Sequence, residues 1–187
     1  MAKIFIIAGP SGVGKDTIID GVKSQIPDLE EAISYTDREK RMDDKPDSYF
    51  FVPKDKFDSL IKEGKIIEWE YARDERRYGS SKKEIGRLLN SGKNLIKVVG
   101  PKSLVNFKKL FPGQLVGIFL KYENLDILKD RIRKNRPDIT EEDLETRYNQ
   151  AFEDMKCEKD YDYSVENPEG HPEIAIKKVT EIIEKEL

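Results

Sequence analysis

The residues best suited to chemistry stand near the start of the chain, where a lysine closes a glycine-rich segment. Residues 3–17 read KIFIIAGPSGVGKDT, an apolar run that breaks into glycines and ends at Lys15 and two polar residues. Backbone N–H groups of such a loop, with the positive end of a following helix, suit a polyphosphate, and the lysine can follow a phosphoryl group during transfer. We therefore predict a phosphate-binding loop formed by Gly9, Ser11, Gly12, Val13, Gly14, Lys15, Asp16 and Thr17.

One position departs from the general pattern of such loops, which place Ser or Thr directly after the lysine. Asp16 occupies that position and Thr17 follows it. Thr17 could supply the hydroxyl that binds magnesium, or Asp16 could hold a magnesium-bound water, and the Asp16 charge also suits the first turn of a helix. The competing interpretation of the segment is a plain glycine turn between a core strand and a helix, with Asp16 only capping.

A second group of polar side chains follows between residues 34 and 51. Arginines, acids, hydroxyls and aromatic rings gather there, a set able to grip a second anion and an attached ring. A solvated charged loop is the competing interpretation, because runs of charge usually lie on the surface. The candidate residues in this stretch are Ser34, Arg38, Arg41, Asp44 and Tyr49.

Apolar runs and helical spacing predict the elements that position these residues. Strands are expected at 4–8, 32–35, 65–71, 95–99, 115–120 and 163–166, and a turn at 78–81. Helices are expected at 15–26, 54–63, 82–89, 101–111, 124–136, from 140 past 155, and at 172–187. This alternation predicts a parallel α/β sheet with helices on both faces. Segment 34–89 should form a lobe in which Glu68 and Glu70 share one strand face, and a basic helical segment at 131–147 should be mobile.

Composition limits the classes of function. The chain has 187 residues, enough for one domain with an inserted lobe, and 38% of them are charged with a formal net charge of −3. This mixed surface does not indicate nucleic acid as a main partner, and the N-terminal apolar run is too short to cross a membrane. A single cysteine, Cys157, rules out an internal disulfide and fits a reducing cytosol. We expect a cytoplasmic protein.

The ordered set of motifs resembles the guanylate kinase family of nucleoside monophosphate kinases over nearly the whole chain. GPSGVGK at 9–15 is close to that family's phosphate loop, and Ser34 with TDREKR at 36–41 is similar to its S-x-T-T-R-x-x-R run. YFF at 49–51, IEW at 67–69, YGS at 78–80, the basic stretch 131–147 and YDY at 161–163, ahead of Asn167, follow in family order. Any one motif alone is weak, whereas the ordered set is specific.

The resemblance implies a P-loop NTPase fold with a three-layer α/β/α core and a parallel sheet. Within one domain, 1–187, the core would comprise 1–33 and 90–187, the monophosphate-binding lobe 34–89, and a helical lid about 131–147. ATP would be the donor, with Mg²⁺ near Thr17 or Asp16 and Asn167 near the adenine. The catalytic residues would be Lys15, Arg131, Arg136 and Arg147. The acceptor nucleotide would contact Ser34, Arg38, Arg41, Asp44, Tyr49, Glu68, Tyr78 and Ser80.

The chain also departs from the family pattern. The family usually carries a D-x-D at the end of the strand expected at 95–99, where this chain has Lys97-Val98-Val99. Arg76 and Arg77 stand where the family shows Asn and Tyr, and their charge could meet a more highly phosphorylated acceptor.

The sequence thus predicts ATP-dependent phosphorylation of a nucleoside monophosphate, GMP or dGMP first, by a monomer or homodimer acting on small-molecule nucleotides. One alternative is a kinase of another small phosphate such as ribose 1,5-bisphosphate. Kinases of that substrate share the fold, can show Lys-Asp after the loop glycine and lack the D-x-D, as this chain does. The other is a binding module of the same fold that has lost catalysis, although Lys15 and the lid arginines are intact.

Overall fold

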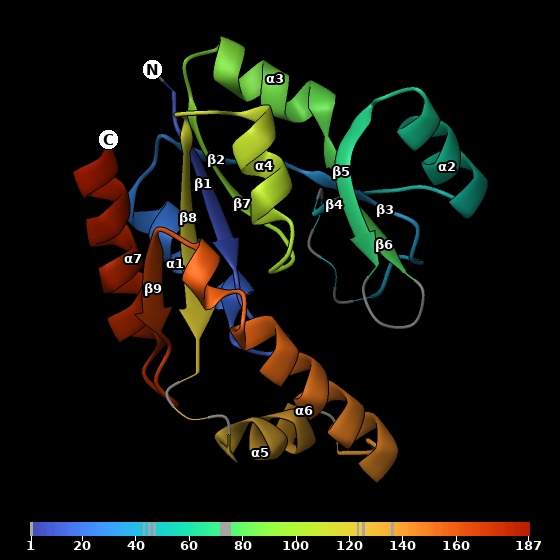
Figure 1. Cartoon of the computed structure of the whole chain (residues 1–187), viewed down its shortest axis with the longest axis vertical. Helices are drawn as coiled ribbons and strands as arrows, with labels where there is room; N and C mark the ends of the chain where they lie inside the picture. The colour runs from blue at the N-terminus through green and yellow to red at the C-terminus, as the bar shows by residue number, and fades with distance from the viewer. Residues whose placement is uncertain are drawn as a thin grey trace.

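The core of the protein is a five-stranded parallel sheet. The computed structural model describes residues 2–42, 44, 46, 48–71, 76–122, 124, 126–135 and 137–187. The strands run in the order β2 (Leu29–Glu31), β7 (Asn94–Val98), β1 (Ile4–Ala8), β8 (Leu115–Lys121) and β9 (Tyr163–Glu166). Every neighbouring pair is parallel. Figure 1 shows the arrowheads of β1 and β8 pointing toward the same edge of the sheet.

Helices cover both faces of this sheet. Side chains of β1 alternate in direction, as the period of two requires. Phe5 and Ile7 pack with α1 (Lys15–Gln25) and α7 (Pro172–Glu186), whereas Ile4 and Ile6 pack with α3 (Lys82–Asn90) and α4 (Leu104–Leu110). The predicted three-layer α/β/α architecture is therefore confirmed.

A second, smaller sheet forms beside the core. Its order is β4 (Tyr49–Phe51), β3 (Ser34–Thr36), β6 (Arg77–Ser81) and β5 (Ile66–Tyr71), with β3 and β4 parallel and the other pairs antiparallel. Helix α2 (Lys54–Lys62) covers the outer face of this sheet by packing Phe57 and Leu60 on Ile66. The opposite face carries the polar side chains, as described below.

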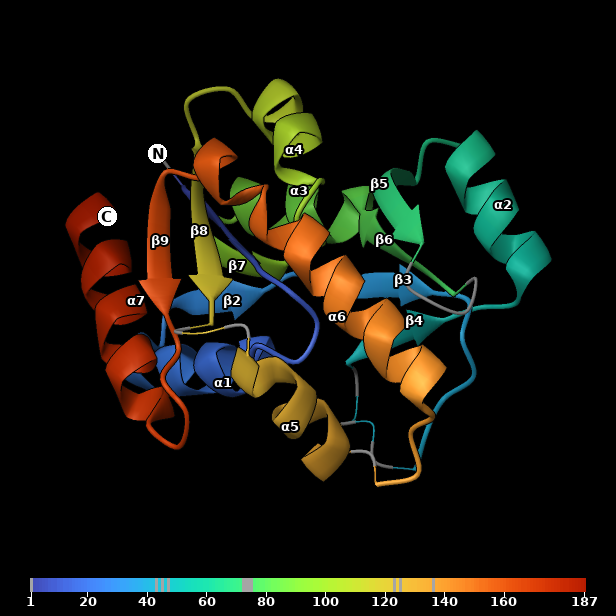
Figure 2. The ribbon, with the colours of Figure 1, turned by 60° about the horizontal axis from the view of Figure 1, so that its bottom comes forward.

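Two helices stand beyond the carboxyl edge of the core sheet. They are α5 (Asp126–Asn135) and α6 (Glu141–Met155), which follow β8 in the chain (Figure 1). The predicted cap of α6 is present, since the Thr140 hydroxyl accepts a hydrogen bond from the Asp143 N–H at 3.2 Å. In Figure 2, which brings the bottom of Figure 1 forward, α5 and α6 lie at the front of the molecule. Among the described residues, no helix is both long enough and apolar enough to cross a membrane.

The local predictions hold for most elements and fail in three places. The turn expected at 78–81 is wrong, because these residues lie in strand β6 between β3 and β5. The strand expected at 32–35 is displaced, because β3 begins only at Ser34 and an unpredicted strand, β2, ends at Glu31 in the other sheet. The helix expected from residue 101 begins at Leu104, after a turn. In each case pairing with distant strands or local turn geometry outweighed the local pattern.

Candidate active site

A tightly folded glycine loop joins β1 to α1 at the carboxyl edge of the core sheet. Gly14 has a φ of 95° and precedes the first residue of α1, and a Cβ there would lie 2.7 Å from Asn167 Nδ2. A Cβ on Gly9 would lie 2.2 Å from the Leu120 carbonyl oxygen. A side chain at either position would force the loop to move, so both close approaches depend on glycine.

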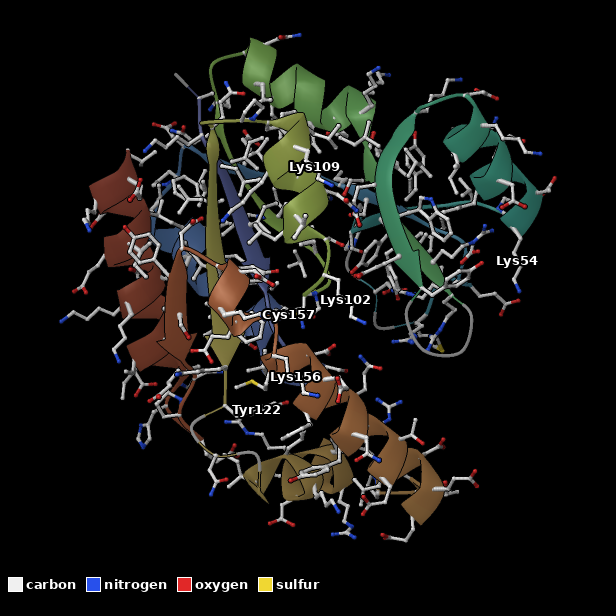
Figure 3. The ribbon with its side chains drawn as sticks, in the orientation of Figure 1. Lys54, Lys102, Lys109, Tyr122, Lys156 and Cys157 are labelled. Atoms are coloured by element: carbon white, nitrogen blue, oxygen red, sulfur yellow. The ribbon has the colours of Figure 1, made fainter. Side chains whose placement is uncertain are left out.

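Two buried side chains from other elements fix the loop. The Tyr122 hydroxyl donates to the Ser11 carbonyl at 2.8 Å, and Asn167 Nδ2 donates to the Val13 carbonyl at 2.7 Å. Figure 3 places Tyr122 between the end of β8 and α5. Asn167 Oδ1 is buried and has no hydrogen-bond partner among the described residues. Asn167 also lines a 230 Å³ cavity together with Gly12, Gly14, Thr17 and Arg131, so a hydrogen-bond acceptor is available beside this cavity.

The loop lysine lies over its own loop. Lys15 Nζ donates to the carbonyls of Gly9 at 2.8 Å and Pro10 at 3.0 Å. Burial lowers the pKa of the Lys15 ammonium, while the nearby carboxylates of Asp16, Asp154 and Glu70 oppose that shift. Glu70 comes from the small sheet and Asp154 from α6, so the lysine lies where the core, the small sheet and α6 approach one another.

The polar face of the small sheet forms one row across four strands. Ser34 pairs with Tyr49 on one side and with Ser80 on the other, and Ser80 pairs with Glu68. Paired residues point to the same side of a sheet, so we call Tyr49, Ser34, Ser80 and Glu68 the acceptor row. Ser34 and Glu68 are two inter-strand spacings apart, about 10 Å. All four residues were predicted from separate motifs, and the fold brings them together.

A second row lies two residues further along the same face. It includes Tyr78 and Glu70, which pair with each other across β6 and β5. Arg38 leaves the end of β3 and donates from Nε to the Tyr78 hydroxyl at 3.0 Å, and its guanidinium lies 5.2 Å from the centre of the Tyr49 ring. This arginine therefore sits at the Tyr49 end of the acceptor row, opposite Glu68.

Asp44 holds Arg38 in a two-pronged ion pair. Arg38 Nη1 and Nη2 lie 2.7 and 2.5 Å from the two Asp44 oxygens, and the Arg41 backbone N–H donates to the same carboxylate at 2.6 Å. The Arg38 contact holds the pKa of Asp44 well below its usual range and raises the pKa of Arg38. The Arg41 side chain is exposed beside this pair. Asp44 thus positions the arginine, which fixes the direction of its remaining N–H group.

Two carboxylates share one serine at the other end of the row. Ser103 Oγ lies 2.5 Å from Glu68 Oε1 and 3.4 Å from Glu70 Oε2. Burial raises the pKa of both, that of Glu70 to about 7, and the charge of Glu68 adds to the shift at Glu70. A Cβ on Gly100 would overlap the Glu70 carboxylate, so the glycine after β7 makes room for this carboxylate. Ser103 and Gly100 were not predicted as site residues.

Comparison with known proteins agrees with this geometry. The sequence model described as guanylate kinase matches residues 1–186 of the chain. The chain belongs to the guanylate kinase family. It is 32% identical over 167 residues to a guanylate kinase of Coxiella burnetii, covering 89% of this chain and 80% of that protein. It is 34% identical to one of Malacoplasma penetrans, covering 90% and 86%.

A solved structure shows the same fold. The chain superposes on a guanylate kinase from Anaplasma phagocytophilum with a TM-score of 0.76, covering 99% of this chain and 86% of that one, at 19% identity. The resemblance stated from the motifs is therefore confirmed for the family and for the fold.

The arginines that were predicted for the lid of this guanylate kinase family member differ in their surroundings. Arg131 on α5 forms an ion pair through Nε with Glu169, which follows β9, and its guanidinium lies 5.4 Å from the centre of the Tyr122 ring. Arg147 lies near the middle of α6 and is partly buried. Arg136 falls outside the described residues. Arg131 borders the cavity next to the glycine loop, whereas Arg147 belongs to the neighbouring helix.

The residues expected near magnesium both lie in the first turn of α1. Asp16 and Thr17 are exposed there, beside the glycine loop. Within the described ranges no group of three His, Cys, Asp or Glu side chains gathers closely enough to hold a metal ion. A carboxylate and a hydroxyl next to a phosphate site are the oxygen donors that Mg²⁺ accepts when phosphates and water supply its other ligands.

The structure contradicts one interpretation of the extra positive charge. Arg77 does not face an acceptor, because it is buried on the α2 side of the small sheet. It forms ion pairs with Asp37 at 2.6 Å and with Asp58, and its guanidinium lies 4.5 Å from the centre of the Phe57 ring. Its charge is neutralised within the lobe and serves packing.

Proposed function

We propose that the protein transfers the γ-phosphoryl group of ATP to GMP or dGMP, giving ADP and the corresponding diphosphate. The acceptor row carries this proposal. Near one end of the row, the Ser34 hydroxyl and the neighbouring Arg38 could bind a phosphate. The Glu68 carboxylate lies about 10 Å from Ser34, and this distance is comparable with the length of a nucleoside monophosphate. Family membership and the glycine loop support the same reaction.

The chemistry at the Glu68 end supports guanine as the base. A carboxylate can accept hydrogen bonds from the ring N–H and the amino group on one edge of guanine, whereas adenine has no such pair of donors. Ser103 donates a hydrogen bond to Glu68 Oε1, and among the described residues no side chain donates to the other carboxylate oxygen. Ser80, directly opposite Glu68 in the row, would add a hydroxyl to the same edge.

Transfer itself would need little covalent chemistry. The acceptor phosphate is an adequate nucleophile near neutral pH, so catalysis would come from positioning and charge neutralisation. Lys15 would follow the transferred group after leaving its two carbonyl partners, while Arg131, Arg136 and Arg147 would approach with the lid. Asn167 and the cavity beside it would receive the adenosine part of ATP. Magnesium, next to Thr17 and Asp16, would neutralise phosphate charge.

The setting of the reaction is proposed in the same terms. The division into a core, a lobe at 34–89 and a lid near 131–147 would let the acceptor face close on the glycine loop. The substrates would be small-molecule nucleotides, with no nucleic acid or membrane partner, in a cytoplasmic monomer or homodimer. The single cysteine and the balanced charge are compatible with that setting.

A kinase of ribose 1,5-bisphosphate is the second candidate, and Lys97 is the observation that favours it. This lysine replaces an acidic residue of the family pattern and lies against Ser34, so it adds positive charge near the acceptor phosphate. A sugar bisphosphate would have no base for Glu68, however, and would leave the carboxylate oxygen that Ser103 does not contact without a hydrogen-bond donor from the substrate.

The test is an ADP-release assay with ATP, magnesium and a panel of acceptors: GMP, dGMP, AMP, UMP, CMP and ribose 1,5-bisphosphate. We expect GMP and dGMP to have the highest kcat/KM, by at least about 100-fold over AMP. Turnover of the sugar bisphosphate alone would overturn the assignment of guanine, and absence of turnover with every acceptor would favour a binding module.

A further inference from the structure

Lys97 is a buried charge that connects the core sheet to the acceptor row. It lies in the middle of β7 with a relative exposure of 1%. Its Nζ donates to Ser34 Oγ at 2.6 Å and to the Ala32 carbonyl at 3.1 Å. Ser34 belongs to the small sheet, so this ammonium is a direct polar contact between the β7 strand and the residues that face the acceptor.

The hydrogen bond to Ser34 has a directional consequence. An ammonium group has only donors, so the Ser34 oxygen accepts from Lys97 and its own hydroxyl hydrogen must point to another acceptor. A phosphate oxygen is such an acceptor. The contact therefore leaves the Ser34 hydroxyl free to donate within the acceptor row, next to Tyr49 and Arg38.

The same charge acts on the opposite end of the row. Glu68 on β5 is near enough to Lys97 for the ammonium to favour the ionised carboxylate, against the burial that favours the neutral acid. Two further carboxylates are coupled to this pair: Glu31 on β2, whose charge acts on Lys97, and Glu70, on which the charge of Glu68 acts. Only an ionised Glu68 offers acceptors on both oxygens while Ser103 occupies one of them.

We propose that Lys97 is a specificity-determining positioning residue of the acceptor site, which orients Ser34 as a donor to the acceptor phosphate and keeps Glu68 in the anionic form that guanine requires. This inference rests on the proposed function and names a residue for which the family pattern has a different side chain. Lys97 need not touch the substrate, because it acts through Ser34 and Glu68.

The first measurement needs no substrate. The side-chain carboxyl groups of Glu68 and Glu70 would be titrated by ¹³C NMR in the whole protein, with Glu68→Gln used for assignment. In Lys97→Met, which keeps a long side chain, we expect the pKa of Glu68 to rise further, because the ammonium that opposes the effect of burial is gone. Lys97→Gln, which keeps a donor but loses the charge, should show the same rise. Lys93→Met is the matched control, since Lys93 precedes the same strand and is partly exposed, and it should leave the titration unchanged.

The second measurement is the pH dependence of kcat/KM for GMP. In Lys97→Met we expect KM for GMP to rise on the order of tenfold at pH 6.5 and by less at pH 8, because the neutral acid is favoured more at the lower pH. KM for ATP should change less than about twofold. Lys97→Gln should retain part of the Ser34 contact and lose less at pH 8 than Lys97→Met.

Two results would overturn the inference. An unchanged Glu68 titration in both Lys97 variants would show that the ammonium does not set this charge. Equal losses for ATP and GMP that do not vary with pH would show a purely structural lysine. If the wild-type protein does not phosphorylate GMP, the proposed function fails, while the carboxyl titration and the KM of the acceptor that the panel identifies still decide the role of Lys97.

Discussion

The buried ammonium of Lys97 predicts a substitution that strengthens the fold while it weakens the acceptor site. Burial lowers the pKa of Lys97 from 10.5 to about 8, which corresponds to about 3 kcal/mol of lost folding free energy while the lysine is charged. Lys97→Met removes this penalty and also removes two hydrogen bonds, to Ser34 and Ala32, at about 1 kcal/mol each. The variant should therefore be more stable by about 1 kcal/mol at pH 7.

The sign of this difference should reverse at high pH. The folded pKa lies below the unfolded pKa, so the penalty is complete below about pH 8 and disappears as pH rises toward 10.5. Near pH 10 the wild-type lysine is neutral in the fold but still mostly charged in the unfolded chain, so about 1 kcal/mol of the penalty remains against about 2 kcal/mol of lost hydrogen bonds. Lys97→Met should then be the less stable protein by about 1 kcal/mol.

Urea unfolding at pH 7 and pH 10 measures this directly, with equal m-values required for a valid comparison. Lys93→Met controls for the general effect of alkaline pH and should follow the wild-type curve. A Lys97→Met protein that is less stable than the wild type at both pH values, by the same amount, would refute the reasoning, because it would mean that the buried ammonium is not strained by desolvation.

Three further substitutions test other parts of the site. Lys15→Met should lower kcat at least about 1,000-fold with little change in the unfolding free energy, since phosphoryl transfer depends on charge at this position. A normal rate would refute the role of the loop lysine. Gly14→Ala should raise KM for ATP and destabilise the fold by about 1–3 kcal/mol, because the residue has a φ of 95° and a Cβ would meet Asn167. Initial rates at varied ATP measure KM, and urea unfolding measures the stability. Unchanged values would show that the loop tolerates a side chain. Glu169→Gln should lower KM for ATP by up to about fivefold, because it releases Arg131 from its ion pair. Initial rates at varied ATP measure this change. A higher KM would mean that Glu169 helps to position the arginine.

The sequence predicted the core well because its strands are continuous apolar runs. Residues 4–8 and 115–120 are buried on both faces of a parallel sheet, and such runs leave little ambiguity. The helices with strong capping or apolar spacing, such as α6 and α7, also fell within a residue or two of their predicted bounds. The family resemblance then placed the glycine loop relative to these elements.

The small sheet was harder to predict because its strands have three to six residues and only one apolar face. Residues 78–81 look like a turn in isolation, since Gly79 and the serines are typical turn residues. They form a strand because Phe57 and Ile66 pack against Gly79, where a side chain would collide. A contact between distant segments decided this structure, and the local pattern carried no sign of it.

The site residues that sequence reasoning missed act through others. Ser103, Gly100, Tyr122 and Glu169 belong to no motif, and each becomes visible only through the group that it contacts. Lys97 did carry a signal, because a lysine inside the apolar run LIKVV must be buried with polar partners or break the strand. Its partners, Ser34 and Ala32, could not be named before the two sheets were placed side by side.

The most direct test of the proposed function is the specificity ratio of one variant. kcat/KM for GMP and for AMP would be measured in the wild-type protein and in Glu68→Gln, which keeps the size of the side chain and loses its charge. If Glu68 accepts hydrogen bonds from guanine, the preference for GMP over AMP falls at least about tenfold while the value for AMP stays the same. An equal loss for both acceptors would contradict the account, because it would mean that Glu68 supports the fold of the lobe and does not recognise the base.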